Sequence, residues 1–470
     1  MSGKPDLNQL KTKLQASLKP DQIADDPASC HAYSMDNSRL HHPPHLVVFP
    51  ENHEQTQTII QAAFEHRIPV TTRGRGTGTA GGSVPVCGGI VLVTDRMNRL
   101  LEFRPEDRLA RVQVGMLNSD LQKAISAAGF FWPPDPTSQA LCTIGGNLGC
   151  NAAGPHAVKY GTTRENVLGL RAIDGQGQSI EVGAETTKAV VGQDFTRLLI
   201  GSEGTLAVIT EAILKLTPKP EQTRLIRGLY PDMHLAAAAV SAIMAQAVLP
   251  AAVEFIDRNA LNLIREHASV DIPNWAGAML MIEVDGTGFD IDHNLKAVQN
   301  AAQKPGATLD IAHTQAEQKQ LWAARKALSP TLRHIAPKKI NEDVVVPVSR
   351  IPDLIAKLDQ IAQQTGIAIV NFGHAGNGNI HVNLLVNPDD PAQMAQANTA
   401  LDEIFRRVLA LGGTLSGEHG IGYVKRKFVS LELNPATLSL MHAVKRQFDP
   451  AGILNPQKKL PDPETPVSLV

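Results

Sequence analysis

Short hydrophobic runs and longer segments with helical spacing alternate along the first half of the chain. Residues 7–18 and 54–66 place apolar side chains three and four positions apart, which predicts amphipathic helices. The apolar runs at 46–49 and 68–72 are too short for helices and predict buried strands. Strands and helices are therefore expected to follow one another closely in this part of the chain.

The same alternation continues up to residue 216. Residues 117–129 have helical spacing and end at a glycine, which is a frequent helix stop. Four further apolar runs predict strands, at 90–93, 110–114, 167–173 and 208–216. This mixture of short strands and helices predicts α+β lobes built on mixed sheets.

A Thr-Pro-Lys-Pro string at residues 217–220 predicts a linker, because its two prolines interrupt both helices and strands. Beyond it, apolar runs at 225–230 and 278–284 predict strands separated by alanine-rich helices. The remaining expected elements are helices at 315–335, 352–365 and 400–411 and strands at 344–348 and 367–372.

Composition indicates a soluble protein of more than one domain. A length of 470 residues exceeds what one ordinary hydrophobic core organises, so two domains or three lobes are expected. A formal net charge of −2 gives no basic surplus for nucleic acid or an anionic membrane. Aromatic residues at 4% predict aliphatic cores and argue against platforms that stack nucleic-acid bases.

The four cysteines, Cys30, Cys87, Cys142 and Cys150, contain no C-x-x-C pair. This spacing argues against zinc fingers, iron–sulfur modules and a disulfide framework, and it fits a reducing cytoplasm. Residues 1–20 are polar and lack the apolar stretch of a secretory signal, and no run is long enough to cross a bilayer. We expect a cytoplasmic protein without a transmembrane segment, and peripheral association with the inner membrane is left open.

The glycine-rich segment at 71–83 is the first candidate binding site. Its glycines allow several backbone N–H groups to turn toward one point, and Arg73 and Arg75 add cationic donors, which suits a pyrophosphate. The segment is not a G-x-G-x-x-G string that opens a helix, and it lacks the G-K-[ST] ending of a P-loop. A nicotinamide site of the Rossmann type is therefore disfavoured, and a plain glycine loop is the alternative.

Three more segments combine proline, glycine or other small residues with polar ones, at 133–137, 143–154 and 201–209. Such segments allow a large flat ligand to lie close against the backbone. Each could be a structural turn, but four such segments within so short a stretch favour a common ligand.

Two glycine-padded strings near the C-terminus carry metal-ligand chemistry, at residues 371–383 and 416–422. Imidazole and carboxylate groups together can hold a divalent metal, and a further histidine can move a proton. An α-hydroxy acid offers a hydroxyl and a carboxylate for the open positions of such a metal. The spacing is not HExxH, and the alternative is that glycine turns happen to carry surface histidines.

Six motifs occur in a characteristic order: R-G-x-G-T-x-x-x-G-G, P-P-D-P, C-T-I-G-G-N-x-x-x-N-A-x-G, K-Y-G, I-G-S-E-G-T-L and S-G-E-H-G-I-G. Together they resemble the FAD-linked D-2-hydroxyacid dehydrogenases, which are flavoproteins of the vanillyl-alcohol oxidase type. That family includes D-lactate dehydrogenase, D-2-hydroxyglutarate dehydrogenase and the glycolate oxidase flavin subunit. The resemblance covers residues 33–455, which is nearly the whole chain.

The resemblance implies an α+β protein with a PCMH-type FAD-binding domain at 1–220, whose cradle spans 42–218. It further implies a ferredoxin-like α+β substrate or cap domain at 221–410. A C-terminal segment at 411–470 is expected to return to the flavin and complete the active site.

The resemblance also implies which residues contact FAD. The glycine-rich string would bind the pyrophosphate, Glu203, Gly204 and Ile209 would lie near the adenosine half, and Asn455 would reach the isoalloxazine ring. The FAD is expected to be noncovalent, because His or Cys is missing where relatives with covalent flavin carry it. The full expected set is Arg73, Gly74, Arg75, Gly76, Thr77, Gly78, Thr79, Pro134, Asp135, Thr143, Gly146, Asn147, Asn151, Ala153, Gly154, Gly161, Glu203, Gly204, Ile209 and Asn455.

For the active site, the resemblance implies a Zn, Mn or Fe ion, a catalytic base and a substrate clamp. The residues that match are the metal ligands His374, His381 and Glu418, the base His419, and the substrate-binding Arg325 and Asn383. Where hydroxyglutarate enzymes carry Lys-Tyr-Asp, this chain has Asn341-Glu342-Asp343, which disfavours a second substrate carboxylate. Lys338 or Lys339 is close enough in sequence to compensate, and Lys339 is counted as substrate-binding.

The activity implied is metal-dependent oxidation of a D-2-hydroxy acid to the 2-oxo acid by hydride transfer to flavin N5, with D-lactate favoured. D-2-hydroxyglutarate and glycolate are the competing candidate substrates. Ether-lipid synthesis, a nicotinamide-linked reductase activity and a non-catalytic role in binding flavin or metal are further candidate functions. A quinone, a cytochrome or an electron-transfer flavoprotein would accept the electrons, and a homodimer is left open.

Overall fold

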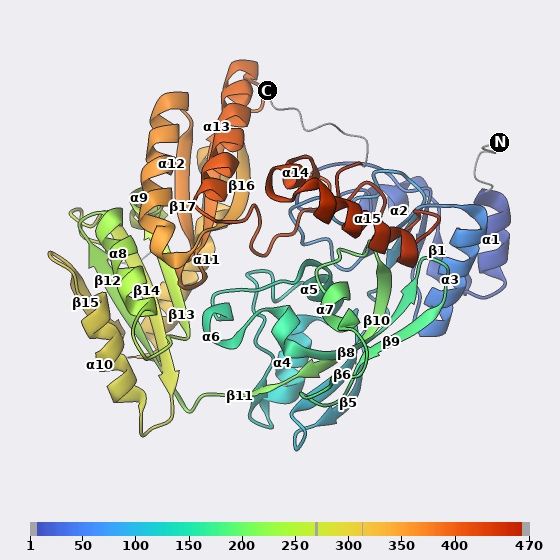
Figure 1. Ribbon diagram of the computed structural model, residues 1–470, viewed down its shortest axis with the longest axis horizontal. Helices are drawn as coiled ribbons and strands as arrows, with labels where there is room; N and C mark the ends of the chain where they lie inside the picture. Colours follow the sequence, from blue (N-terminus) through green and yellow to red (C-terminus); the bar gives the residue numbers. More distant parts are fainter. Residues whose placement is uncertain (1–6, 268–270, 313, 463–470) are drawn as a thin grey trace. The chain divides into compact units, whose positions relative to one another are not determined.

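The structure, a computed structural model, describes residues 7–267, 271–312 and 314–462 (Figure 1). The chain forms two compact units. The first comprises Met1–Ala153, Gly161–Lys219 and Glu418–Val470, and the second comprises Gly154–Tyr160 and Pro220–Gly417. The chain therefore passes from the second unit back to the first between Gly417 and Glu418.

One sheet of the first unit has four strands in the order β1-β2-β4-β3. The strands are β1 (Ile23–Ala24), β2 (Leu46–Val48), β3 (Val70–Arg73) and β4 (Ile90–Val93). β2, β4 and β3 are parallel, and β2 and β4 are buried at every position, so they read as continuous apolar runs. Helices α1 (Leu7–Gln15) and α3 (His53–His66) pack their apolar faces into the same core.

The other large sheet of the first unit has five antiparallel strands in the order β5-β6-β10-β8-β9. The strands are β5 (Leu100–Arg104), β6 (Leu109–Gln113), β8 (Val167–Asp174), β9 (Ser179–Gly183) and β10 (Ala207–Lys215). Around Trp132, α4 (Asn118–Ser126), α5 (Ile144–Cys150) and α7 (Phe195–Leu199) complete its core. The unit also contains α2 (Pro27–Ala32), the paired β7 (Phe130–Phe131) and β11 (Thr217–Pro218), α14 (Val429–Glu432) and α15 (Pro435–Phe448).

The second unit is built on a seven-stranded antiparallel sheet in the order β15-β12-β14-β13-β17-β18-β16. The strands are β12 (Gln222–Tyr230), β13 (Ala252–Asp257), β14 (Ala278–Gly286), β15 (Thr308–Ala312), β16 (Lys338–Val345), β17 (Ala368–His374) and β18 (Asn379–Val386). The central strands β13 and β18 are buried at every position. Polar residues within them therefore need partners inside the protein.

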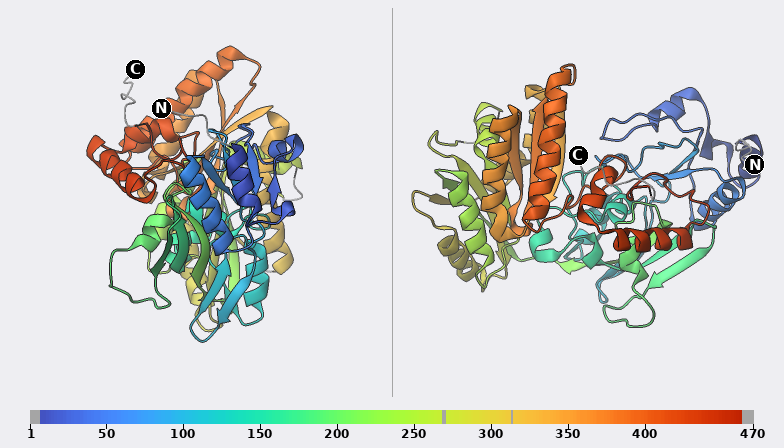
Figure 2. Two further views of the ribbon diagram at one scale, coloured as in Figure 1. Left: turned by 90° about the vertical axis from the view of Figure 1, so that its right-hand side faces the viewer. Right: turned by 45° about the horizontal axis from the view of Figure 1, so that its top comes forward.

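Helices cover both faces of this sheet (Figures 1 and 2). One face packs against α8 (Met233–Met244), α10 (Ile291–Ala302), α12 (Ile351–Thr365) and α13 (Pro391–Ala410). On the opposite face, α9 (Arg258–His267) and α11 (Gln315–Ile335) share one hydrophobic core with β13, β14 and β17. The short helix α6 (Ala157–Tyr160) also packs beside β13.

Some predicted boundaries were wrong. The strand expected at 344–348 is only the end of β16, which begins at Lys338. The helix expected from residue 400 begins at Pro391, where Asp390 caps it. Its first half was missed because the small residues there form no clear apolar stripe. Strands β13 and β18 were not expected. Polar residues interrupt the apolar run of β13, and the alternating residues of β18 were interpreted only as a source of metal ligands.

The expectation of an α+β fold with mixed sheets is confirmed. Across the described residues, none of the helices has both the length and the apolar character needed to cross a membrane.

Candidate metal centre and flavin-binding site

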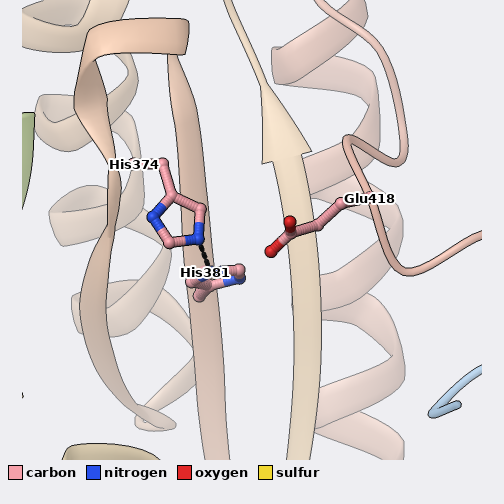
Figure 3. Close-up of side chains that lie close together, drawn as sticks. All are labelled: His374, His381 and Glu418. Carbon is pink, nitrogen blue, oxygen red and sulfur yellow. Dashed lines mark hydrogen bonds between the residues drawn. The ribbon is translucent and has the colours of Figure 1, made fainter. Parts of the chain in front are cut away.

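Three of the predicted ligands lie together in the structure (Figure 3). His374 ends β17, His381 lies in β18, and Glu418 follows the last residue of the second unit. One ligand atom from each residue lies within 4.8 Å of the others, and the two imidazole Nε2 atoms are 3.4 Å apart. Two imidazoles and one carboxylate with converging donor atoms fit a divalent cation and leave coordination positions open.

The β17–β18 hairpin brings the two histidines together. The two strands pair antiparallel, with Phe372 opposite His381. The turn between them ends at Gly378, whose φ is +76°, and a Cβ there would lie 1.8 Å from the Val346 carbonyl oxygen. Only glycine fits this position, because an L side chain would be strained and would also collide with the backbone.

Glu418 is held in place through the residues before it. The Gly417 N–H lies 2.8 Å from the Asp343 carbonyl oxygen and 2.9 Å from an oxygen of the Asp343 carboxylate. The Ser416 hydroxyl donates to the same carboxylate at 3.0 Å. Asp343 lies opposite His381 in the β16–β18 pairing, so this buried acid links the third ligand to the strand of the second.

Glu254 is a functional candidate that the sequence did not reveal. It lies in β13 opposite His374, and its side chain is 1% exposed. Its carboxylate accepts a 2.6 Å hydrogen bond from His374 Nδ1 and a 2.8 Å bond from Arg325 Nε. Burial would raise the pKa of Glu254, but the nearby His374 and Arg325 outweigh this effect and lower it. The ionised carboxylate favours the His374 tautomer with its proton on Nδ1 and its Nε2 lone pair available.

Arg325, the predicted substrate clamp, extends from α11 into this cluster. Its Nη2 lies 2.7 Å from Glu254 in addition to the Nε contact, and its guanidinium lies 4.7 Å from the centre of the Phe372 ring. The Nε edge of the guanidinium is therefore directed at Glu254. The remaining edge is the part that could approach a substrate carboxylate.

The predicted Asn383 and Lys339 lie on the same face of the sheet as His381, further along the strands. Asn341 lies opposite Asn383 in the β16–β18 pairing. The side-chain oxygens of Asn341 and Asn383 are buried and have no hydrogen-bond partner among the described residues. Lys339 donates to the Ser329 hydroxyl at 2.6 Å. Asn341 was noticed in the sequence only as a departure from a motif.

The predicted base His419 lies between Glu418 and a turn that Glu203 anchors. The Glu203 carboxylate accepts hydrogen bonds from the backbone N–H groups of Ile421, at 2.9 Å, and Gly422, at 2.6 Å. Glu203 therefore binds the loop that carries His419. No pattern in the sequence indicated this contact. Contact of Glu203 with the adenosine half of FAD stays a prediction.

The glycine-rich segment after β3 forms a cradle in the first unit. A Cβ on Gly74 would lie 2.4 Å from the Thr143 hydroxyl, and one on Gly76 would lie 2.2 Å from the Arg73 guanidinium. Arg73 donates to the Met35 carbonyl at 2.8 Å, and Arg75 pairs with Asp95 at 3.0 Å. Two of the predicted strings, 73–79 and 143–154, thus meet.

Buried polar atoms around this cradle fit a polar ligand such as FAD. Within the described part of the chain, Asn147 Nδ2 and Thr72 Oγ1 are buried without a hydrogen-bond partner. Gly204 lies beside Thr72, and Asn455 donates to the Glu203 carbonyl at 2.6 Å. Each unpartnered group would cost about 1–3 kcal/mol, so a ligand that satisfies them would stabilise the site.

The other predicted FAD residues belong to the first unit, apart from Gly154, which is grouped with the second. Thr143 caps α5, Asn151 accepts from the Thr162 hydroxyl, and Pro134 accepts from Asn118. Ile209 lies in β10 and packs against the core of the five-stranded sheet. The remaining members, Gly146, Ala153, Gly161 and Asp135, lie in α5 or in the connections around it.

Comparison with known proteins agrees with these features. Residues 44–183 match the family described as FAD binding domain, and residues 219–459 match FAD linked oxidases, C-terminal domain. A glycolate oxidase subunit GlcD from Bacillus subtilis is 37% identical over 96% of each chain. A D-2-hydroxyglutarate dehydrogenase from Stutzerimonas stutzeri is 32% identical over 95% of this chain and 97% of its own. A D-lactate dehydrogenase from Anaerostipes hadrus is 30% identical over 88% of this chain and 89% of its own.

Solved structures share the fold at low sequence identity. p-Cresol methylhydroxylase superposes with a TM-score of 0.81 at 17% identity and covers 97% of each chain. An alkyldihydroxyacetonephosphate synthase superposes with a TM-score of 0.75 at 21% identity and covers 98% of this chain and 87% of its own. These likenesses concern the fold alone.

The fold, the cradle and these matches define an FAD-dependent oxidoreductase. The chain belongs to the FAD-linked oxidases, in the family of glycolate oxidase, D-lactate dehydrogenase and D-2-hydroxyglutarate dehydrogenase. The resemblance found in the sequence motifs is thereby confirmed.

Proposed function

We propose that this protein is a metal-dependent dehydrogenase that oxidises a D-2-hydroxy acid, with D-lactate favoured, to the 2-oxo acid. The observation that carries the proposal is the convergence of His374, His381 and Glu418 in a chain of this family. A 2-hydroxy acid can chelate a cation through its hydroxyl and carboxylate oxygens, which matches the open positions of such a site.

Alcohol oxidation removes a proton from oxygen and a hydride from carbon. Bound FAD would supply the hydride acceptor, and a bound Zn, Mn or Fe cation would supply Lewis-acid polarisation of the hydroxyl. His419 would accept the hydroxyl proton on a ring nitrogen, since imidazole is basic enough at neutral pH. Arg325 would hold the substrate carboxylate with the edge that Glu254 leaves available, and Asn383 would contact the substrate.

Asn341 and Asn383 support a substrate without a second carboxylate. Their buried side-chain oxygens are acceptors, which repel an ionised carboxylate and would accept from a hydrogen-bond donor. Lys339, which could bind a second carboxylate, is bonded to Ser329. These contacts favour D-lactate over D-2-hydroxyglutarate. Glycolate is the second candidate, because the relative at 37% identity is named a glycolate oxidase subunit.

The test is anaerobic mixing of the purified flavoprotein with D-lactate, L-lactate, glycolate and D-2-hydroxyglutarate while flavin absorbance is followed. D-lactate should bleach the flavin fastest and form pyruvate. In Asn341→Lys, the ratio of kcat/KM for D-2-hydroxyglutarate over D-lactate should rise about 10-fold or more, as expected for a gained charge-assisted contact. Bleaching by none of these acids would contradict the proposed activity.

The proposal extends to the surroundings of the reaction. The FAD would be noncovalent, and the reduced flavin would pass electrons to a quinone, a cytochrome or an electron-transfer flavoprotein. The protein would work in the cytoplasm as a monomer or homodimer, and a quinone or membrane-bound cytochrome as acceptor would bring it to the inner membrane.

A further inference from the structure

One buried carboxylate joins two functional groups of the second unit. Glu254 accepts from His374 Nδ1 at 2.6 Å and contacts Arg325 through Nε at 2.8 Å and Nη2 at 2.7 Å. The two contacts use different oxygens, Oε1 for the histidine and Oε2 for the arginine. Neither partner can turn away without leaving a buried carboxylate oxygen unpaired.

The surroundings of Glu254 make this arrangement rigid. The residue lies in a central strand that is buried at every position, between β14 and β17. Arg325 is also packed over Phe372, the residue opposite both Ile256 and His381 in the sheet. The carboxylate is therefore held by the sheet on one side and by α11 on the other.

The chemistry of a histidine ligand explains why such a carboxylate matters. A hydrogen bond from Nδ1–H fixes the tautomer and the ring orientation, and it increases the basicity of Nε2. The Nε2 atom of His374 is the one that faces Nε2 of His381, 3.4 Å away. The bond to Glu254 therefore aims the His374 donor atom at the candidate metal position.

We infer that Glu254 is a positioning residue that both orients His374 toward the metal and fixes the guanidinium of Arg325 toward the substrate carboxylate. The inference rests on the proposed metal site but not on the identity of the hydroxy acid. One buried acid would thus set the relative placement of cation and clamp, which a chelating substrate must engage together.

Glu254→Gln tests the histidine contact without any turnover. We expect it to weaken Zn²⁺ binding about 10–100-fold, which is typical when a histidine ligand loses its carboxylate partner. Competition of the purified holoprotein with a chromophoric chelator measures this. The yellow flavin spectrum should persist, since the cradle residues 73–79 belong to the first unit.

Asp257→Asn is the matched control. Asp257 lies three residues further along the same strand and is similarly buried. Because side chains alternate between the two faces of a sheet, Asp257 faces the opposite side from Glu254. Its carboxylate bonds to Ala260 and Asn371 and to neither His374 nor Arg325. Its Zn²⁺ affinity should stay within about 3-fold of wild type, as for a site that shares no partner with the metal ligands.

The arginine contact is tested with a double-mutant cycle on KM. Arg325→Gln should raise KM for the preferred acid, and Glu254→Gln should raise it as well. The two effects should be non-additive by about 5-fold or more, because the guanidinium is already released in the single Glu254 variant. A merely structural role would lower protein yield or melting temperature without this KM coupling.

Two results would overturn the inference. One is Zn²⁺ affinity of Glu254→Gln within about 3-fold of wild type, and the other is additive KM effects in the cycle. If Glu254→Gln does not fold, Glu254→Asp replaces it. Aspartate keeps the carboxylate, but its side chain is one methylene shorter, so the contacts to His374 and Arg325 should lengthen and both defects should appear in weaker form. Wild-type Zn²⁺ affinity and KM in that variant would equally contradict the role. Failure of every acid to bleach the flavin would count against the proposed function alone, since the Zn²⁺ titration does not depend on turnover.

Discussion

Three residues apart in β13, Glu254 and Asp257 show how burial and partners decide the behaviour of the same functional group. Glu254 meets the Arg325 guanidinium and the Nδ1–H of the His374 imidazole, and these partners lower its pKa. Asp257 meets only N–H donors, from Ala260 and Asn371, and its burial raises its pKa to about 7. Similar carboxyl groups on one strand are thus suited to different roles.

The raised pKa of Asp257 predicts a pH-dependent stability. The folded protein favours the neutral carboxyl. Its contribution to the free energy of unfolding is therefore present at low pH and is lost as pH rises through about 7. In Asp257→Asn this loss is absent. From about pH 5 to about pH 8, the free energy of unfolding of wild type should fall by about 2–3 kcal/mol relative to that variant. Urea unfolding at both pH values measures the difference, and a constant difference would contradict the prediction.

His419 carries a second prediction at the scale of one residue. His419→Ala should keep its FAD spectrum but reduce the flavin with substrate about 10²–10⁴ times more slowly, the usual contribution of a general base. Anaerobic stopped-flow measurement of flavin bleaching provides the rate. Wild-type bleaching rates in this variant would remove His419 from the role of base.

The candidate ligands that the structure brings together sit in distinctive sequence strings, whereas the isolated Glu254 was missed. Glycines lie close to His374, His381 and Glu418 in the sequence, and such glycine-rich strings are conspicuous because ordinary helices and strands contain few glycines. Glu254 is one acid in the run Ala-Val-Glu-Phe-Ile-Asp, which has no local signal. Its importance arises from Arg325 and His374, which are 71 and 120 positions away in the chain.

At the scale of elements, the β17–β18 hairpin is the unit that builds the candidate metal site. Its turn depends on Gly378, as the 1.8 Å approach of a Cβ to the Val346 carbonyl shows. The sequence pattern predicted β17, but β18 was missed, although polar and apolar residues alternate from Asn379 to Leu384, because that string was interpreted only as a source of metal ligands. A buried central strand can contain such residues when its neighbours satisfy them.

Gly378→Ala tests the hairpin. The left-handed backbone alone should cost about 1–3 kcal/mol, and the displaced turn should also weaken Zn²⁺ binding, since His381 follows three residues later. Gly366→Ala is the control, because Gly366 has a similar φ of +68° but no atom within 4 Å of an added Cβ. It should lose about 1–2 kcal/mol of stability and keep its Zn²⁺ affinity. Equal Zn²⁺ affinity of the two variants would contradict the role of the turn.

At the scale of the whole molecule, the two candidate sites depend largely on different parts of the chain. The glycine-rich cradle lies in the first unit and both histidine ligands lie in the second, while Glu418 begins the last segment of the first unit. Loss of the metal should therefore leave the FAD-binding residues undisturbed.

Metal removal tests this separation. Dialysis against a chelator should abolish oxidation of the hydroxy acid while the flavin absorbance remains, and added Zn²⁺ or Mn²⁺ should restore activity. The metal content and the visible spectrum of the same sample provide the measurement. Full turnover in metal-free protein would refute the metal dependence, and release of FAD with the metal would refute the separation.

The sequence by itself determined the family, most of the strands and helices, and the chemistry available in each glycine-rich string. These features are local, because backbone conformation and hydrophobic periodicity depend on neighbouring residues. Tertiary structure alone decided that Glu254 meets His374 and Arg325, that Glu203 holds the His419 loop, and that Asn341 faces Asn383. Pairing between distant strands brings these residues together, and no local pattern in the chain encodes that register.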